Sequence, residues 1–222
     1  TDFDTDFGTQ SATNADTIKI DASANSGGTK IDITGDTTVP RYVTFTGGSG
    51  NDNAIVSKGS LDEYDTFALG EGTEDVITTT VTLTGNVTNV FYTDTLAASK
   101  LPTISGVEIA AINLNSANGD RTVSVGSADF ASTICLLDDL GAYDATINKI
   151  KVGTAIKLGK TLDMTANGSA IILTQDGATS TAPSSSLTIT SDLLEDPASA
   201  TNVTIDDLQA DTTSALNLTL SS

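Results

Sequence analysis

Short runs in which apolar and polar residues alternate recur along most of the chain. Residues 17–21 (Thr-Ile-Lys-Ile-Asp) and 42–45 (Tyr-Val-Thr-Phe) place every second side chain on one face, which is the period of a β-strand. Residues 1–7 alternate in the same way, with Phe and Thr on one face and Asp on the other. We expect this run to be an edge strand guarded by its carboxylates. The alternative is that it docks on a neighbouring subunit, with the carboxylates sharing an ion.

Similar β-like runs continue to the end of the chain, separated by short loops of Gly, Asn, Asp, Ser and Pro. We expect them at residues 30–34, 76–84, 87–92, 107–114, 122–125, 147–152, 155–158, 161–164, 170–174, 187–190, 202–205 and 215–220. Residues 127–139 alone have weak helical character, and we expect a short helix or a solenoid corner there. The pattern predicts an all-β fold, either a β-solenoid of the parallel β-roll or β-helix kind or a β-sandwich, and the glycine-rich turn described below favours the solenoid.

The composition agrees with narrow stacked coils. The chain has 222 residues, only 5% aromatic residues, and neither Trp nor His. Its core must therefore be built from Val, Ile, Leu, Ala and the methyl groups of Thr. We expect one β-rich region over residues 1–125, which contains the glycine-rich turn, and a second over residues 126–222. The alternative is that the second region is continuous with the first.

Residues 47–52 (Gly-Gly-Ser-Gly-Asn-Asp) carry the most specific chemistry in the sequence. They match the first six positions of the nonapeptide GGxGxDxUx, which builds calcium-binding parallel β-rolls. Glycines allow a tight turn whose carbonyl groups face inward, and the aspartate adds a charged oxygen. Calcium prefers roughly 6–8 such oxygen ligands. The apolar eighth position holds Ala54, and the larger Ile55 comes one residue later.

A weaker copy follows at residues 69–76 (Leu-Gly-Glu-Gly-Thr-Glu-Asp-Val), where Glu74 takes the place of the aspartate and Val76 the apolar position. The two turns together predict a Ca²⁺ site. The alternative is that they are ordinary turns of an acidic surface protein. A second acidic group, which includes Asp192, Asp196 and Asp206, is expected to be a solvated face. The candidate metal ligands are Gly48, Gly50, Asp52, Asp65, Gly70, Gly72, Glu74 and Asp75.

This arrangement resembles bacterial surface-layer and adhesin proteins of the RTX type. The resemblance is specific over residues 47–77, where the GGxGxD turn is followed by residues 61–66 (Leu-Asp-Glu-Tyr-Asp-Thr) and 70–75. Residues 15–20 and 104–114 are similar in style. The resemblance implies a secreted structural protein whose repeats bind calcium and which assembles into a coat, sheet or fibre. The departures in the second turn put the number of ions in question.

The charge balance bears on the partners. Lys and Arg total 10 against 29 Asp and Glu, a net charge of −19. Such self-repulsion disfavours a compact state unless cations offset it. Nucleic acid is not an expected partner, because binding phosphates needs clustered Lys and Arg. No apolar run is long enough to span a bilayer, so membrane insertion is not expected. Cys135 is the only cysteine, which excludes an internal disulfide, and we expect it to be buried among apolar residues.

Catalysis is not expected. The absence of His excludes every catalytic triad that uses it. β-Helical enzymes that act on polysaccharides use paired carboxylates. They also need cationic or aromatic side chains to hold sugars, and those are scarce here. We therefore expect an extracellular cell-surface protein that assembles with copies of itself into a surface layer or filament in a calcium-dependent way. The alternative is an adhesin or phage-fibre module that binds a glycan or a host surface.

Overall fold

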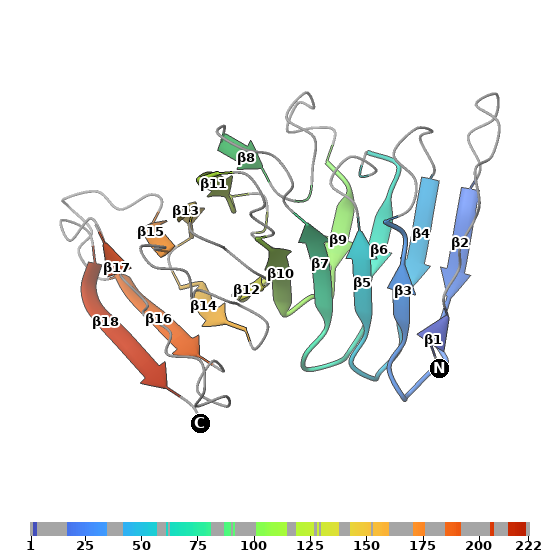
Figure 1. The fold of residues 1–222 in the computed structure, drawn as a ribbon. Helices are drawn as coiled ribbons and strands as arrows, with labels where there is room; N and C mark the ends of the chain where they lie inside the picture. The colour runs from blue at the N-terminus through green and yellow to red at the C-terminus, as the bar shows by residue number, and fades with distance from the viewer. Residues whose placement is uncertain are drawn as a thin grey trace. The chain divides into compact units, whose positions relative to one another are not determined.

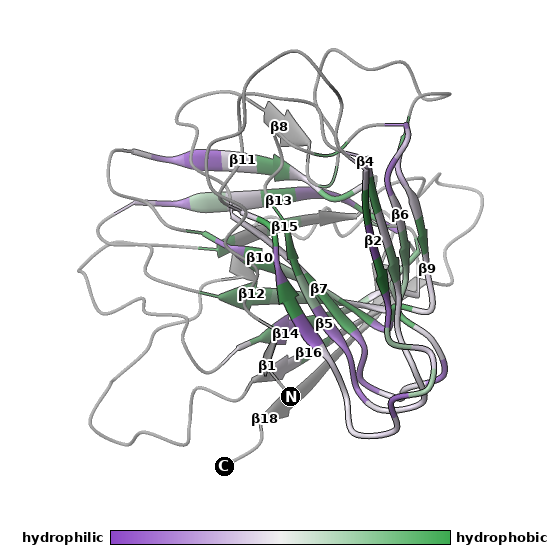
Figure 2. Cartoon of the chain, turned by 90° about the vertical axis from the view of Figure 1, so that its right-hand side faces the viewer, coloured by the Kyte–Doolittle hydropathy of each residue, from purple (hydrophilic) through white to green (hydrophobic). Residues whose placement is uncertain are grey.

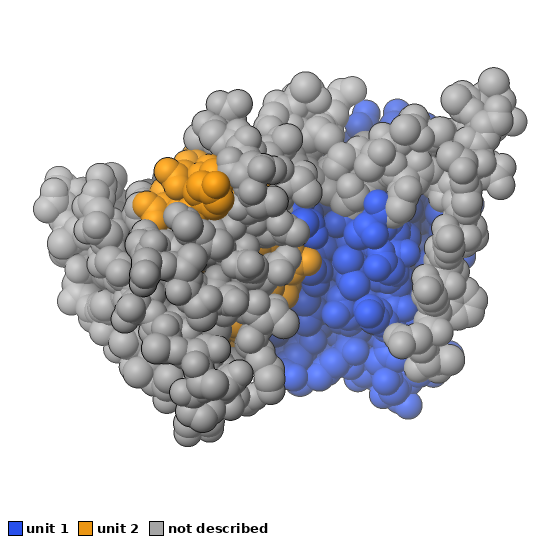
Figure 3. All heavy atoms as spheres, viewed as in Figure 1, with its two compact units in different colours: residues 1–80, 91–110 blue, residues 81–90, 111–222 orange. Residues whose placement is uncertain are grey.

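The computed structural model describes residues 2–3, 17–34, 42–56, 61, 63–80, 87–89, 91, 101–114, 119–126, 128, 130–137, 143–151, 153–159, 171–175, 185–191, 205–206 and 213–220. Every regular element in these ranges is a β-strand, and none is a helix. The chain forms two compact units, residues 1–80 with 91–110 and residues 81–90 with 111–222. Figure 3 colours the two units separately.

The first unit is a parallel β-solenoid built from two sheets. One sheet has the order β1 (Asp2–Phe3), β3 (Lys30–Asp32), β5 (Asn53–Val56), β7 (Val76–Thr80). The other has the order β2 (Thr17–Asp21), β4 (Tyr42–Thr46), β6 (Thr66–Ala68), β9 (Thr103–Ser105). The chain passes alternately from one sheet to the other, so each coil adds one strand to each sheet (Figure 1).

The register of these strands stacks like side chains above one another. Phe45 pairs with Phe67, which pairs with Ile104, and both phenylalanines are fully buried. Their neighbours Thr44 and Thr66 point to the opposite face, because successive side chains of a strand alternate. Figure 2 shows the resulting alternation of hydrophobic and hydrophilic positions along the strands. Period-two patterning therefore builds the core of this unit.

The second unit repeats the same plan. One sheet has the order β8 (Val87–Asn89), β11 (Arg121–Ser124), β13 (Ala145–Ile150), β15 (Ile171–Gln175), β17 (Ile205–Asp206). Opposite it lie β12 (Thr133–Leu137), β14 (Ala155–Leu158), β16 (Ser185–Ser191) and β18 (Thr213–Leu220). Val123, Ile147 and Leu173 align in register and are buried, as are Ile134, Ile156 and Ile189. Strand β10 (Ile109–Asn113) crosses the boundary between the units.

The solenoid prediction is confirmed, since every described strand pairing is parallel. Of the two structures expected for residues 127–139, the helix is wrong, because β12 occupies Thr133–Leu137 and Ile134, Cys135 and Leu136 are all buried in it. The solenoid corner agrees with the turn before β12, where the backbone N–H of Ala128 donates to the carbonyl oxygen of Val125 and that of Ala131 to the carbonyl oxygen of Ala128. The short strands β5, β6 and β9 were missed. Of the run at residues 1–7 only β1 is described, and the run at 161–164 lies outside the described residues. The division at residues 125/126 stays a prediction.

Candidate functional site in the stacked glycine turns

The two glycine-rich turns lie on neighbouring coils. Residues 47–52 connect β4 to β5, and residues 69–75 connect β6 to β7. Because β4 pairs with β6 and β5 pairs with β7, the two turns stack directly on each other. Residues 22–29, between β2 and β3, form the preceding turn of the same stack, and these turns run together at the lower edge of Figure 2.

The Asp52 carboxylate holds two backbone groups. The backbone N–H of Thr29, on the preceding coil, donates to Oδ1 of Asp52 at 2.5 Å. The backbone N–H of Gly48, within the same turn, donates to Oδ2 at 2.8 Å. The Asp52 side chain is 1% exposed, so these bonds form away from water. Asp52 therefore fastens its own turn and the turn of the coil before it.

Asp75 repeats this arrangement one coil further along. Its Oδ1 accepts the backbone N–H of Asp52 at 2.6 Å, and its Oδ2 accepts the N–H of Gly72 at 3.1 Å. Glu108 then accepts the backbone N–H of Asp75 at 2.9 Å. Asp52, Asp75 and Glu108 directly precede β5, β7 and β10, which are consecutive strands of one sheet. We call these three residues the carboxylate ladder, in which each acid caps the backbone of the coil before it.

Burial changes the acidity of the middle member of the ladder. Loss of hydration raises the pKa of Asp75 above the usual aspartate value, and repulsion from Glu108 and Asp52 adds to the increase. The hydrogen bonds from the backbone N–H groups of Asp52 and Gly72 lower the pKa in part. The backbone donors therefore offset only some of the cost of burying this charge.

The glycines allow the turns to approach closely. A Cβ atom at Gly48 would collide with the backbone oxygen of Asn25, and one at Gly70 would collide with the backbone oxygen of Gly48. Gly70 also has a φ of +109°, which side chains other than that of glycine rarely adopt. The glycine spacing is thus required by the contact between successive coils.

Asparagine side chains complete the stack at its surface. Oδ1 of Asn51 accepts the backbone N–H groups of Thr73 and Glu74 at 3.1 and 3.3 Å. On the preceding coil, Nδ2 of Asn25 donates to Oγ1 of Thr29 at 2.9 Å. Asn25, Thr29 and Glu108 were not among the predicted site residues. The position directly before each strand is the signal that could have identified Thr29 and Glu108.

The register corrects the expected equivalence of the two turns. Asn53 pairs with Val76 and Ala54 with Ile77, so Asp75 stands opposite Asp52 where Glu74 was expected. The second turn is one residue longer than the first. As a consequence Ile77, fully buried, occupies the core position that was expected for Val76. Ala54 is fully buried, as the motif predicts.

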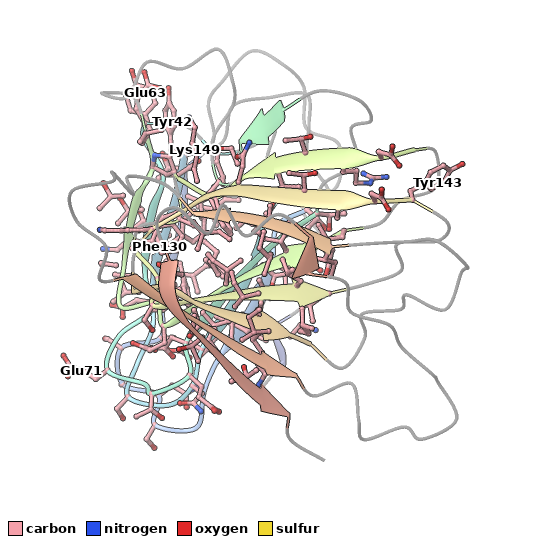
Figure 4. All side chains as sticks on the ribbon, turned by 90° about the vertical axis from the view of Figure 1, so that its left-hand side faces the viewer. Tyr42, Glu63, Glu71, Phe130, Tyr143 and Lys149 are labelled. Atoms are coloured by element: carbon pink, nitrogen blue, oxygen red, sulfur yellow. The ribbon has the colours of Figure 1, made fainter. Side chains whose placement is uncertain are left out.

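The predicted metal ligands fall into three places. Gly48, Gly50, Asp52, Gly70, Gly72 and Asp75 come together in the stacked turns. Glu74 is exposed on the turn surface, where its Oε2 lies 3.4 Å from Nδ2 of Asn51. Asp65 is buried at the start of β6, away from the turn that follows this strand, and it accepts the backbone N–H of Val43 at 2.8 Å. Figure 4 shows Tyr42 and Glu63 at the end of the strands opposite Glu71.

The arrangement of these acids gives Asp52 and Asp75 a structural role that needs no ion. All four of their carboxylate oxygens already accept a backbone N–H. Across the described ranges, no group of three or more His, Cys, Asp or Glu side chains is placed to hold a metal ion. Calcium binding at these turns stays a prediction.

The remaining sequence predictions concern single residues and the second acidic group. Cys135 is buried at 7% exposure and forms no disulfide, as expected. Of the second acidic group, only Asp206 lies in a described strand, β17. Asp192, Glu195, Asp196, Asp207 and Asp211 lie outside the described residues.

Comparisons with known proteins give no relative from which a function could be inferred, so the functional proposal rests on the fold and the carboxylate ladder. No protein family model, curated protein or solved structure matches the chain significantly. A search of the described residues for a helix long and apolar enough to cross a membrane found none.

Proposed function

We propose that this chain is a structural component of an extracellular surface layer or filament and assembles with copies of itself rather than acting as an enzyme. The observation that carries the proposal is the role of the turn residues. Asp52, Asp75, Glu108 and the glycines that resemble a ligand-binding motif all fasten one coil to the next. A chain whose most specific chemistry stabilises stacking is suited to a scaffold.

Calcium enters the proposal through the charge of the protein. At a net charge of −19, copies that approach one another repel unless cations lie between them. Glu71 and Glu74 are exposed on the turn surface, and Glu71 projects away from the stack in Figure 4. We propose that calcium lowers the repulsion between such surfaces and thereby allows assembly.

Electron microscopy of the purified protein tests this function. In millimolar calcium we expect sheets or filaments, and in excess chelator we expect dispersed particles. Magnesium at equal concentration is the control for simple screening of charge. Dispersed particles in both calcium and chelator would contradict self-assembly. Equal assembly in calcium, magnesium and chelator would contradict the calcium dependence while leaving self-assembly in place.

The second candidate function, a glycan-binding adhesin module, is favoured by one observation. The rings of Tyr42 and Tyr64, on neighbouring coils, contact each other in a tilted arrangement, with centroids 4.6 Å apart and an interplanar angle of 57°. Tyr64 is 58% exposed, and an exposed aromatic ring can pack against the apolar face of a sugar. An adhesin module would stay monomeric in calcium and bind a glycan array, and Tyr64→Ala would abolish that binding.

A further inference from the structure

Strand β2 ends its sheet on one side. Among the described strands its only neighbour is β4, and Figure 1 shows β2 as the last strand of this sheet. The backbone N–H of Ala22 donates to the carbonyl oxygen of Thr46 at 2.7 Å and therefore points toward β4. Because successive N–H groups of a strand point to opposite sides, those of Lys19 and Asp21 point away from β4, toward the edge that no described strand occupies; we call this side of β2 the open edge. This edge offers backbone donors and acceptors for one more strand.

The core side of β2 is also incompletely covered. Ile18 and Ile20 pair in register with Val43 and Phe45 of β4. Val43 and Phe45 are buried at 5% and 0% exposure, whereas Ile18 and Ile20 are only half-buried. A further strand at the edge of β2 would cover both isoleucines. A coil of a solenoid cannot bury its apolar face alone and needs a neighbour to cover it.

The charges on β2 indicate which strand fits. Lys19 and Asp21 lie on the outer face of the strand and are both exposed. The Asp21 carboxylate accepts hydrogen bonds from the Ser23 backbone N–H at 3.1 Å and from the Ser23 hydroxyl at 2.7 Å, which fixes its position. A lysine on an edge strand normally guards against pairing with other strands. Here Lys19 and Asp21 together make the edge complementary to itself.

We propose that β2 pairs antiparallel with β2 of a second copy of this chain, with Lys19 of each copy opposite Asp21 of the other. In this register Ile20 faces its own counterpart on the core side, and the Lys19–Asp21 pairs form twice on the outer face. Opposite residues in antiparallel strands lie about 4.5–5.5 Å apart at Cβ, close enough for ion pairs. The register with Lys19 opposite Lys19 would place like charges together.

This inference names one contact of the self-assembly proposed above, and it can fail separately from that function. A contact limited to one strand edge belongs to the weak class of interfaces. We therefore expect a monomer–dimer equilibrium that is visible by sedimentation at high protein concentration. In hydrogen exchange, the amides of Lys19 and Asp21 should become more protected as the protein concentration rises.

Charge variants test the register. Lys19→Asp should weaken the dimer about tenfold or more, because both ion pairs become repulsive. Adding Asp21→Lys to that variant should restore the dimer, because the pairs re-form with the charges exchanged. Lys30→Asp makes the same change of charge on the exposed lysine of β3 and should leave the dimer unchanged. Equal loss in the single and double variants would overturn the register.

A proline variant tests the edge itself. Lys19→Pro removes an N–H that points to the open edge and leaves the hydrogen bond from the Ala22 N–H to the Thr46 carbonyl oxygen in place. The variant should therefore fold as a monomer but no longer dimerise. Protection of Lys19 and Asp21 that does not depend on concentration would mean that the chain covers its own edge, and would overturn the proposal. If Lys19→Pro still assembles in calcium while its dimer is lost, the self-assembly stands and β2 pairing is not needed for it.

Discussion

The carboxylate of Asp75 accepts a 2.6 Å hydrogen bond from the backbone N–H of Asp52, a residue 23 positions earlier and one coil below. Asp52 makes the equivalent bond to Thr29, also across 23 positions. Where each of these turns joins its strand, the backbone N–H thus donates to an acidic side chain of the next coil and not to a backbone carbonyl group. The spacing of these acids follows the length of one coil, so the ladder links the sequence repeat directly to the stacking of the solenoid.

Removing an acid of the ladder should cost more than removing an acid at the surface. Asp52→Ala leaves the buried N–H groups of Thr29 and Gly48 without their acceptor. Each unsatisfied group costs about 1–3 kcal/mol, so for the two groups we expect a loss of about 2–6 kcal/mol in the free energy of unfolding. Glu74→Ala, at an exposed position two residues beyond Gly72, should change it by less than about 0.5 kcal/mol. Urea denaturation of both variants makes the comparison, and similar losses would contradict the ladder.

Glycine positions that touch the neighbouring coil should not tolerate a side chain. Gly48→Ala would drive a Cβ into the backbone oxygen of Asn25, and we expect it to cost at least about 1–3 kcal/mol. Gly27→Ala is the matched control, because its nearest neighbour would be Oδ1 of Asn25 at an ordinary 3.5 Å. Thermal melting compares the two. A Gly48→Ala variant as stable as Gly27→Ala would mean that the turns do not pack as closely as described.

A hydroxyl group in the core of the first unit offers a stabilising substitution. Thr79 is 1% exposed, its Oγ1 has no hydrogen-bond partner, and it pairs in register with the buried Val56. Thr79→Val replaces an unsatisfied polar atom by a methyl group of similar size, and we expect a gain of about 1 kcal/mol. Thr78→Val, one residue earlier and on the other face, is the control. A loss of stability for Thr79→Val in urea denaturation would indicate that the hydroxyl is bonded.

The raised pKa of Asp75 predicts the sign of a pH effect. Because burial makes the folded protein bind this proton more tightly than the unfolded chain, Asp75 favours folding less as the pH rises through its folded pKa. The stability of the native chain minus that of Asp75→Asn should therefore fall as the pH rises above the ordinary aspartate pKa of 3.8. Urea denaturation across this range measures the difference. A difference that rises with pH would mean that the N–H bonds to Asp75 outweigh its burial.

The sequence predicted the fold well where one physical signal dominates. Alternation in residues 17–21 and 42–45 specifies strands because only one face of each sheet enters the core, and β2 and β4 lie there. The prediction of a helix within residues 127–139 was wrong because Ile134, Cys135 and Leu136 form a continuous apolar run. Such a run does not distinguish a helix from a strand that is buried on both faces. Strands of three residues, such as β6, are too short to show a period.

The stacking of the two glycine-rich turns could be predicted from the sequence, but their register could not. The glycine–acid motif identifies where turns stack, and Gly48, Asp52 and Asp75 do come together there. One extra residue in the second turn moves the equivalent acid from Glu74 to Asp75, and only the strand pairing reveals it. Glu108 lies 33 residues beyond Asp75, so no fixed period connects the two.

The central claim is that Asp52 and Asp75 act as hydrogen-bond acceptors between coils and do not need a metal ion for that role. Thermal melting of the native chain and of Asp52→Ala, each in calcium and in excess chelator, tests it most directly. We predict that the difference in melting temperature between the two proteins is the same in both conditions. If chelator lowers the native melting temperature to that of Asp52→Ala and so removes the difference, Asp52 acts through a bound metal and the account is contradicted.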